Sequence, residues 1–350
     1  MSGGIAQLVA VGAQDAHLVG NPQVSFFRSA YKRHTNFSTI TERQVIQGNP
    51  APGGMSTIRF ERKGDLLSYA YFTSSTTSGV EPLYSEVWEE RIEKVELLIG
   101  GQVIDEQTSE FSERIAVDTL SATLSKSSSG SHHSGAETAS RFYPLRFSCF
   151  ENWQSALPLV ALQYHDVEIR ITWGTSVPSG VIYECMAHYI CLDDDERRLL
   201  ASKPIDMLIC QVQKAIASGG KISELNFNHP VKFIAMRGTD TGEAFITNHN
   251  RAKIQINGTD ITDYKTVVPN FTSAQSYYHS PWASGNDVAY FLYSFGLDTS
   301  RFQPTGTLNF SRLDSARLMS ETGDIVGTIY AVNYNILRIQ NGMGGVAYSN

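Results

Sequence analysis

Residues 95–105 read V-E-L-L-I-G-G-Q-V-I-D, and residues 252–262 read A-K-I-Q-I-N-G-T-D-I-T. Each stretch is an apolar-alternating strand, a two-residue turn and a second strand. Gly-Gly and Asn-Gly are the dipeptides that a type I′ turn favours, because both central residues of that turn take a positive φ. Similar residues recur at one offset, in the pairs Leu97/Ile254, Ile99/Ile256, Gly101/Gly258 and Ile104/Ile261. A hairpin repeated about half a chain later predicts two tandem copies of one β-domain.

The composition bounds the class of protein. A chain of 350 residues exceeds the roughly 250–300 residues that one hydrophobic core usually serves, so we expect two domains. The net charge of −7 argues against nucleic acid as a direct partner, because that interaction needs a clustered positive surface. The four cysteines form no Cys-x-x-Cys pair, which predicts buried free thiols from a reducing compartment.

Strand patterns dominate the chain. One helix is expected over residues 108–125, with Thr108 and Ser109 as cap candidates, and a short helix after the acidic run at 193–198. Elsewhere the periodicity predicts strands, notably at residues 56–62, 66–72, 91–106, 141–150, 159–173, 181–192, 207–216, 222–227, 231–237, 252–264, 288–297, 305–319 and 325–339. So many strands with so little helix predict an all-β protein of sandwiches or jelly rolls.

The same pass along the chain predicts its domain organisation. Residues 1–25 are small and weakly periodic, which indicates an N-terminal arm ordered by partners. We expect the first β-domain over residues 26–198, a linker with Pro204 over 199–206, and the second β-domain over 207–350.

Two aromatic segments are candidate contact surfaces. Arg28, Lys32 and Arg33 interleave with aromatics in residues 26–37, which favours either an anionic contact surface or a domain entry with solvated charges. In residues 276–282, Tyr277, Tyr278 and Trp282 are candidate subunit contacts, because aromatics supply much of the energy of interfaces; local packing under a loop is the alternative.

Four N-x-S/T sequons are candidate glycosylation sites, at Asn36, Asn257, Asn270 and Asn309. The Asn-Gly turn chemistry explains Asn257 without a glycan.

We find no catalytic, cofactor-binding or metal-binding constellation and expect no enzyme: GxSxG, HExxH, P-loop and kinase signatures are missing from the sequence. No export signal or membrane-spanning apolar stretch is evident. Two other classes stay open. One is a carbohydrate-binding jelly roll with the aromatic loop 276–282 as its sugar platform. The other is a cupin-type metal enzyme, which would need two or three histidines and a carboxylate, yet no His-x-His pattern is present.

Segments spread over nearly the whole chain share one resemblance. They are I-A-Q-L-V-A-V-G-A-Q-D at 5–15, G-N-P-Q at 20–23, and residues 26–37, 95–105, 156–167, 225–230, 290–295, 304–317, 333–339 and 342–345. In this order they resemble the major capsid proteins of large icosahedral double-stranded DNA viruses, most closely those of algal viruses.

The resemblance implies a double jelly roll of two tandem eight-stranded antiparallel sandwiches. It further implies a homotrimer with a pseudo-hexameric outline that tiles a virion shell, and synthesis in the host cell cytoplasm. Minor capsid and penton proteins would be partners. The arm would lie on the inner side near them or an internal membrane, and Arg28, Lys32 and Arg33 would also face inward, toward acidic partners or lipid headgroups. A minor capsid or receptor-binding protein is the nearest alternative. This chain is shorter than many relatives, so shorter loops and fewer glycans are expected.

Overall fold

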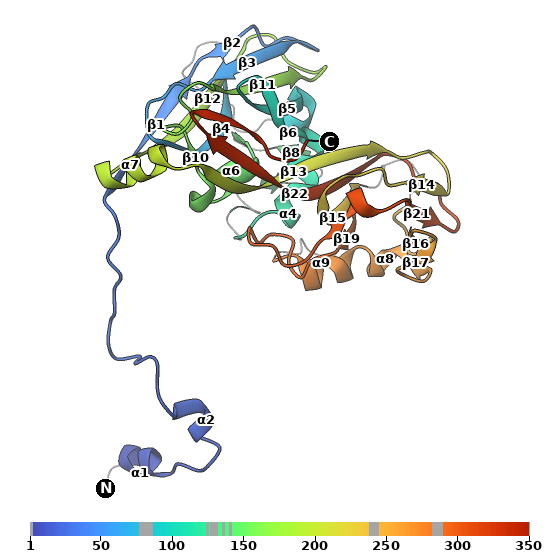
Figure 1. Ribbon diagram of the computed structural model, residues 1–350. Coiled ribbons are helices and arrows are strands. Elements are labelled where there is room, and N and C mark those ends of the chain that lie inside the picture. The colour runs from blue at the N-terminus through green and yellow to red at the C-terminus, as the bar shows by residue number, and fades with distance from the viewer. Residues whose placement is uncertain are drawn as a thin grey trace. The chain divides into compact units, whose positions relative to one another are not determined.

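The structure is a computed structural model that describes residues 3–76, 87–123, 126, 132–134, 137–139, 142–237, 245–281 and 290–349. The chain divides into two compact units, Met1–Asn36 and Phe37–Asn350. Figure 1 shows the elements of both.

The first unit holds two short helices, α1 (Gly3–Val9) and α2 (Ala16–Val19), followed by irregular chain. None of its described residues is buried, so it has no core of its own. This unit carries helical turns that the small residues of 1–25 did not reveal. Residues 26–36, which the sequence grouped with the first β-domain, precede the first strand.

The first half of the second unit is a sandwich of two antiparallel sheets. One sheet has the order β1-β12-β4-β10, with β9 also paired to β4, and the other has the order β2-β3-β11-β5-β6. The strands are β1 (Phe37–Gln44), β2 (Ile46–Gln47), β3 (Met55–Arg59), β4 (Leu66–Thr76), β5 (Ile92–Ile99), β6 (Gln102–Thr108), β9 (Phe142–Pro144), β10 (Leu157–Pro158), β11 (Val167–Trp173) and β12 (Val181–Leu192).

The second half repeats this arrangement. Its sheets have the orders β13-β22-β15-β19 and β14-β21-β16-β17, with β20 on β15, β23 on β22 and β18 on β16. The strands are β13 (Ile205–Ile216), β14 (Ile222–Glu224), β15 (Pro230–Arg237), β16 (Arg251–Ile256), β17 (Thr259–Asp260), β18 (Lys265–Thr266), β19 (Tyr290–Ser294), β20 (Leu308–Asn309), β21 (Ala316–Ser320), β22 (Thr328–Gln340) and β23 (Met343–Val346).

The first half has eight strands in chain order if β2 with β3, and β9 with β10, each count as one. The second half also has eight if the short β18, β20 and β23 are left out. In both halves the first, third, sixth and eighth strands form one sheet, and the other four form the second sheet. This is the strand order of a jelly roll. The expected fold class, all-β with two tandem antiparallel jelly rolls, is confirmed. We call residues 37–192 the first roll and residues 205–346 the second roll.

Short helical elements lie between the strands. They are α3 (Trp88–Arg91), the π-helix η1 (Phe111–Ile115), α4 (Ala116–Thr119), α6 (Ser148–Glu151), the 3₁₀ turn η2 (Trp153–Ser155), α7 (Asp194–Ser202), α8 (Val267–Asn270), α9 (Ser273–His279) and the 3₁₀ turn η3 (Phe310–Arg312). A two-stranded ribbon, β7 (His132–Ser134) and β8 (Glu137–Ala139), lies in the segment whose polar composition resembles a loop.

The two expected helices are present with different bounds. The helix after β6 ends at Thr119, and the Thr108 hydroxyl accepts a hydrogen bond from the Phe111 backbone N–H at 3.3 Å, which confirms that cap. The acidic run begins α7, where the Asp193 carboxylate accepts from the Asp194 N–H. Because α7 continues to Ser202 and β13 begins at Ile205, most of the segment expected to be a linker is regular structure.

The repeated hairpins occupy equivalent places, as β5–β6 in the first roll and β16–β17 in the second. Both turns have positive φ at both central residues, 59° and 81° at Gly100 and Gly101 and 49° and 78° at Asn257 and Gly258. The predicted type I′ geometry is thus confirmed. The Ile104/Ile261 pair does not match in burial: Ile104 is buried, whereas Ile261 lies beyond the two-residue β17 and is exposed.

Several predicted strands were too long, three of them markedly. Residues 145–150 turn into α6, residues 159–166 form turns before β11, and residues 310–315 form η3 and a bend between β20 and β21. In each case irregular chain carries buried apolar residues, so its sequence imitates the pattern of a strand.

Asn257 is expected to stabilise the second hairpin beyond its tolerance of positive φ. Its side-chain oxygen accepts hydrogen bonds from the backbone N–H groups of Asp314 and Ser315 at 2.9 and 3.1 Å. Asn257→Ala should lower the free energy of unfolding by about 2 kcal/mol in chemical denaturation. Asn257→Gly, which removes only the two hydrogen bonds, should cost roughly half as much; equal losses would contradict this account.

Candidate assembly surfaces

The two rolls are joined by a helical segment of the first roll. Phe111 and Ile115 of η1 and Ala116 of α4 pack on the outer face of the β13-β22-β15-β19 sheet. The sheet residues in this cluster are all nearly or fully buried: Phe233, Ala235, Tyr290, Leu292, Tyr330 and Val332. Burial of this much aromatic and aliphatic surface makes the two rolls one rigid body.

A second contact joins the edges of β6 and β13. The Asp105 carboxylate accepts a hydrogen bond from the Val212 N–H at 2.8 Å, and the Gln211 side chain donates to the Ile104 carbonyl at 2.5 Å. Beyond this edge, Ile209, Leu337 and Ile339 of the second roll belong to the hydrophobic core of the first. The rolls therefore share a core as well as a surface.

Charged groups complete the joint. One carboxylate, that of Glu89, accepts from Arg114 of the first roll at 2.8 Å and from Arg237 of the second at 2.9 Å. The Tyr330 hydroxyl donates to Glu110 at 2.7 Å. These partners come from distant parts of the sequence, and nothing in the linear pattern identified them.

Two buried carboxyl groups lie in this joint. Burial raises the pKa of Asp105 to about 7, although hydrogen bonds from Val212 and Gln107 oppose the shift. Burial also raises the pKa of Glu113 to about 7, and the positive charge of Arg146 opposes it. One oxygen of Glu113 has no hydrogen-bond partner among the described residues, so ionisation of Glu113 is not compensated there.

These two carboxyl groups predict a pH dependence. A carboxyl whose pKa is raised by folding holds its proton more tightly in the folded chain, so stability falls as pH rises from about 4 to about 7 and is level above that. We expect the unfolding temperature to be lower at pH 8 than at pH 5. Glu113→Gln should recover on the order of 3 kcal/mol at pH 8 with little effect at pH 5.

The measurement is thermal unfolding of the wild-type protein and of Glu113→Gln across pH 4–9. Glu93→Gln is the control, because Glu93 is exposed in the same roll. A wild-type profile that rises between pH 5 and 8 would show that these carboxyl groups do not control stability.

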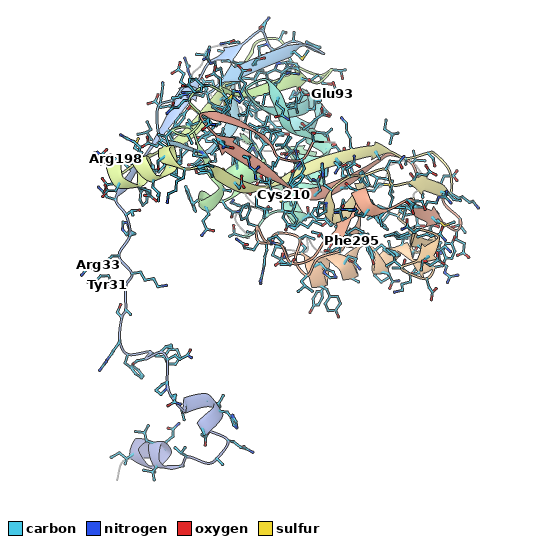
Figure 2. The ribbon with its side chains drawn as sticks, viewed as in Figure 1. Tyr31, Arg33, Glu93, Arg198, Cys210 and Phe295 are labelled. Atoms are coloured by element: carbon cyan, nitrogen blue, oxygen red, sulfur yellow. The ribbon has the colours of Figure 1, made fainter. Side chains whose placement is uncertain are left out.

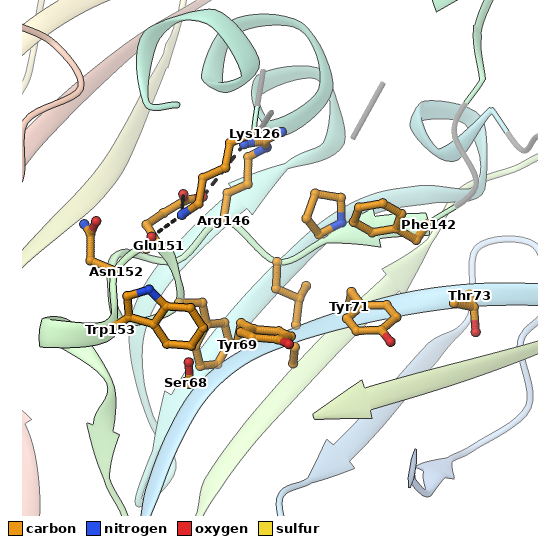
Figure 3. Close-up of a pocket in the computed structure, with 14 residues that line it drawn as sticks. Ser68, Tyr69, Tyr71, Thr73, Lys126, Phe142, Arg146, Glu151, Asn152 and Trp153 are labelled. Carbon is orange, nitrogen blue, oxygen red and sulfur yellow. Dashed lines mark hydrogen bonds and ion pairs between the residues drawn. The ribbon is translucent and has the colours of Figure 1, made fainter. Parts of the chain in front are cut away.

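An apolar groove lies on the outer face of the first roll. It has a volume of about 640 Å³ and lies along β4, β9 and α6, next to Lys126. Figure 3 shows Tyr69, Tyr71, Phe142 and Trp153 along it, with Arg146, Glu151 and Asn152 at one end. Tyr69 stacks on His188 with ring centroids 4.4 Å apart, so the groove has an ordered aromatic wall. The alternation Tyr69-Ala-Tyr71 was the sequence signal for this face, and our sequence analysis missed it.

The aromatic contact residues predicted at 276–282 are partly placed. Tyr277 and Tyr278 lie on α9 and are 74% and 75% exposed. Their rings meet edge to face, 5.0 Å apart at 88°, which does not form the flat platform that a sugar ring stacks on. Trp282 lies outside the described residues.

The basic cluster lies in the first unit. Arg28, Lys32 and Arg33 are all exposed, and so are the aromatics among them: Phe27 is 98% exposed and Tyr31 84%. Figure 2 labels Tyr31 and Arg33, whose side chains point away from the backbone of this segment.

The four sequons differ in accessibility. Asn36 and Asn309 are exposed, and Asn309 caps η3 through its side-chain oxygen. Asn257 is exposed with its oxygen bound to two backbone N–H groups. Asn270 is half-buried, and its amide nitrogen donates to Thr266, so this nitrogen is the least accessible to a glycan.

The remaining candidate chemistry is sparse. Cys149 and Cys185 are buried free thiols as predicted, whereas Cys191 and Cys210 are only half-buried. Within the described ranges, no group of three or more His, Cys, Asp or Glu side chains is placed to hold a metal ion. The described helices include none with the length and hydropathy of a membrane span.

Comparison with known families agrees with this architecture. Residues 25–193 match the family described as major capsid protein N-terminus, and residues 196–345 match the family described as large eukaryotic DNA virus major capsid protein. The boundary between the two matches falls in α7, between the two rolls.

Individual relatives extend over the whole chain. The chain is 36% identical to the major capsid protein of Pyramimonas orientalis virus over 398 residues, and 31% identical to that of Paramecium bursaria Chlorella virus 1 over 450, with complete coverage of both partners in each case. A chain of the PBCV-1 virus capsid has a TM-score of 0.76 at 26% identity and covers 93% of this chain and 100% of its own. Both alignments are longer than 350 residues, so each relative carries insertions.

Two tandem jelly rolls locked into one body define the chain as a double jelly-roll capsid protein. It belongs to the family of major capsid proteins of large eukaryotic DNA viruses, and its role is a structural one in the virion shell. Members of this family are structural proteins rather than enzymes.

Proposed function

We propose that three copies of this chain close into a ring with a pseudo-hexameric outline, and that these trimers tile the capsid. The observation that carries the proposal is the rigid joint between two rolls of identical strand order. Three such chains present six similar sandwiches, and a heterologous contact closes a ring when its rotation divides the circle. The likeness to a chain of the PBCV-1 virus capsid supports the same assembly.

The proposal includes partners for the first unit. Its exposed apolar side chains, among them Leu8, Leu18 and Phe26, have no core to enter within that unit. Exposed apolar surface of this kind marks an interaction site. Minor capsid or penton proteins, or an internal membrane, would meet this arm on the inner side of the shell, where Arg28, Lys32 and Arg33 would contact acidic groups or lipid headgroups.

The same proposal carries the remaining expectations. Synthesis takes place in the host cell cytoplasm, and the chain is organised as an N-terminal arm (1–25), two β-domains (26–198 and 207–350) built around the two rolls, and a connection (199–206).

Light scattering on a sizing column tests the trimer. We expect a species of three times the 38.7 kDa monomer mass that looks hexagonal in negative stain. A monomer that keeps native circular dichroism at micromolar concentration would contradict the proposal.

Charge reversal tests the role of the arm. Arg28→Glu, Lys32→Glu and Arg33→Glu together should leave the trimer intact, because these residues lie outside the rolls, and should reduce shell assembly at least tenfold. The matched control reverses three exposed charges of the second unit: Arg43→Glu, Arg198→Glu and Arg312→Glu. Equal shell yields from the two triple variants would contradict an inner-face role for the arm cluster.

A further inference from the structure

The strand registers align the residues of the two rolls with one another. In the first roll, β12 pairs His188 with Tyr69 and then Tyr189 with Leu67, which leaves Ser68 in a bulge. In the second, β22 pairs Val332 with Phe233 and then Asn333 with Val231, which leaves Lys232 in a bulge. The bulges fall at the same position, so β4 and β15 align without ambiguity.

This alignment gives each outward-facing residue of one roll a counterpart in the other. The outer face of the second roll consists of Phe233, Ala235, Tyr290, Leu292, Tyr330 and Val332. The pairings of β4 with β9 and β12, and of β15 with β19 and β22, assign to them, in the same order, Tyr69, Tyr71, Phe142, Pro144, Met186 and His188.

The two equivalent faces differ in what covers them. In the second roll the six residues are buried beneath the helical segment that follows β6 of the first roll. In the first roll only His188 of the six is buried, and the other five are half-buried. Four of them line the 640 Å³ groove (Figure 3). The face that is closed inside the chain in one roll is therefore an open groove in the other.

The segment that covers the second roll also has a counterpart. Phe111 and Ile115 belong to η1, which lies between the β5–β6 hairpin and β9. In the second roll, α8 and α9 lie between the β16–β17 hairpin and β19. On α9, Tyr277 and Tyr278 are the exposed aromatics.

We propose that the groove on the first roll is the docking site for α9 of a second copy of this chain, with Tyr277 and Tyr278 of that copy in contact with Tyr69, Tyr71 and Trp153. This inference rests on the proposed trimer and specifies its contact. In the proposed ring, one and the same rotation relates the first roll to the second roll of a copy, and that second roll to the first roll of the next copy. The joint inside the chain is then repeated between chains, and three repeats close the ring.

The chemistry of the two surfaces is complementary. The groove is mainly apolar and aromatic, and α9 (S-A-Q-S-Y-Y-H) has no acidic, lysine or arginine side chain that would be desolvated on docking. Tyrosine needs a hydrogen-bond partner for its hydroxyl when its ring is buried. Arg146, Glu151 and Asn152 at the end of the groove supply donors and acceptors for such partners.

Complementation between two variants tests this docking. One variant, Tyr277→Asp with Tyr278→Asp, removes the α9 contact. The other, Tyr71→Asp, spoils the groove. Each alone should raise the concentration at which the trimer dissociates by about 30-fold or more, the effect of losing a strong interface residue. A mixture of the two should form a heterodimer of twice 38.7 kDa, because one intact groove and one intact α9 remain on different copies.

Two controls keep the result specific. Tyr164→Asp places an acid at an exposed tyrosine of similar exposure, 75%, outside both surfaces and should remain trimeric. Near-ultraviolet circular dichroism checks that each variant is folded. Should Tyr71→Asp unfold, Trp153→Asp replaces it, because Trp153 is 68% exposed at the same groove.

The outcomes separate this inference from the trimer itself. If wild type and both variants are equally stable trimers, the docking site is wrong and the trimer stands. If both variants are monomeric and their mixture stays monomeric, the pairing of the groove with α9 is wrong. A Tyr164→Asp chain that also dissociates would overturn the same pairing. A free oligosaccharide bound through Tyr71 in an intact trimer would make the groove a sugar site. A wild-type chain that is folded and monomeric would overturn the trimer and the docking together.

Discussion

The burial of one sheet face of the second roll beneath Phe111 and Ile115 of the first is the contact on which the rest of the structure depends. A jelly roll alone can leave the outer faces of its sheets in water. Here a short helical segment closes one of them and fixes the angle between the two rolls. Because the β13 and β22 strands also enter the core of the first roll, the joint cannot hinge without exposing apolar surface.

Rigidity of this kind is what a shell protein requires. A capsid face is a lattice of repeated contacts, and an error in the angle between two rolls would accumulate across the lattice. The joint also holds two buried carboxyls, those of Asp105 and Glu113, whose pKa values burial raises to about 7. Acidic conditions therefore strengthen the joint, and alkaline conditions weaken it.

Gene duplication explains why the internal joint is informative about assembly. The two rolls keep one strand order, one bulge position and one arrangement of outward-facing residues, yet only one face is covered inside the chain. In the proposed trimer, the groove of one copy and the exposed tyrosines of α9 on the next copy would form the counterpart of the joint inside the chain. The strand registers and the burial of equivalent residues thus connect a cavity of the first roll with a helix of the second.

The sequence by itself determined the fold class, the duplication and the two type I′ hairpins, because alternation and Asn-Gly or Gly-Gly turns are local properties that tertiary contacts did not override. Its resemblance to viral capsid proteins also led to the family. The sequence overextended strands at residues 145–150 and 159–166, where apolar side chains are buried by loops. Only the tertiary structure revealed the joint, the groove beside Tyr69 and Tyr71, and the buried carboxyls, since the contacts of the joint connect residues 25 to more than 200 positions apart.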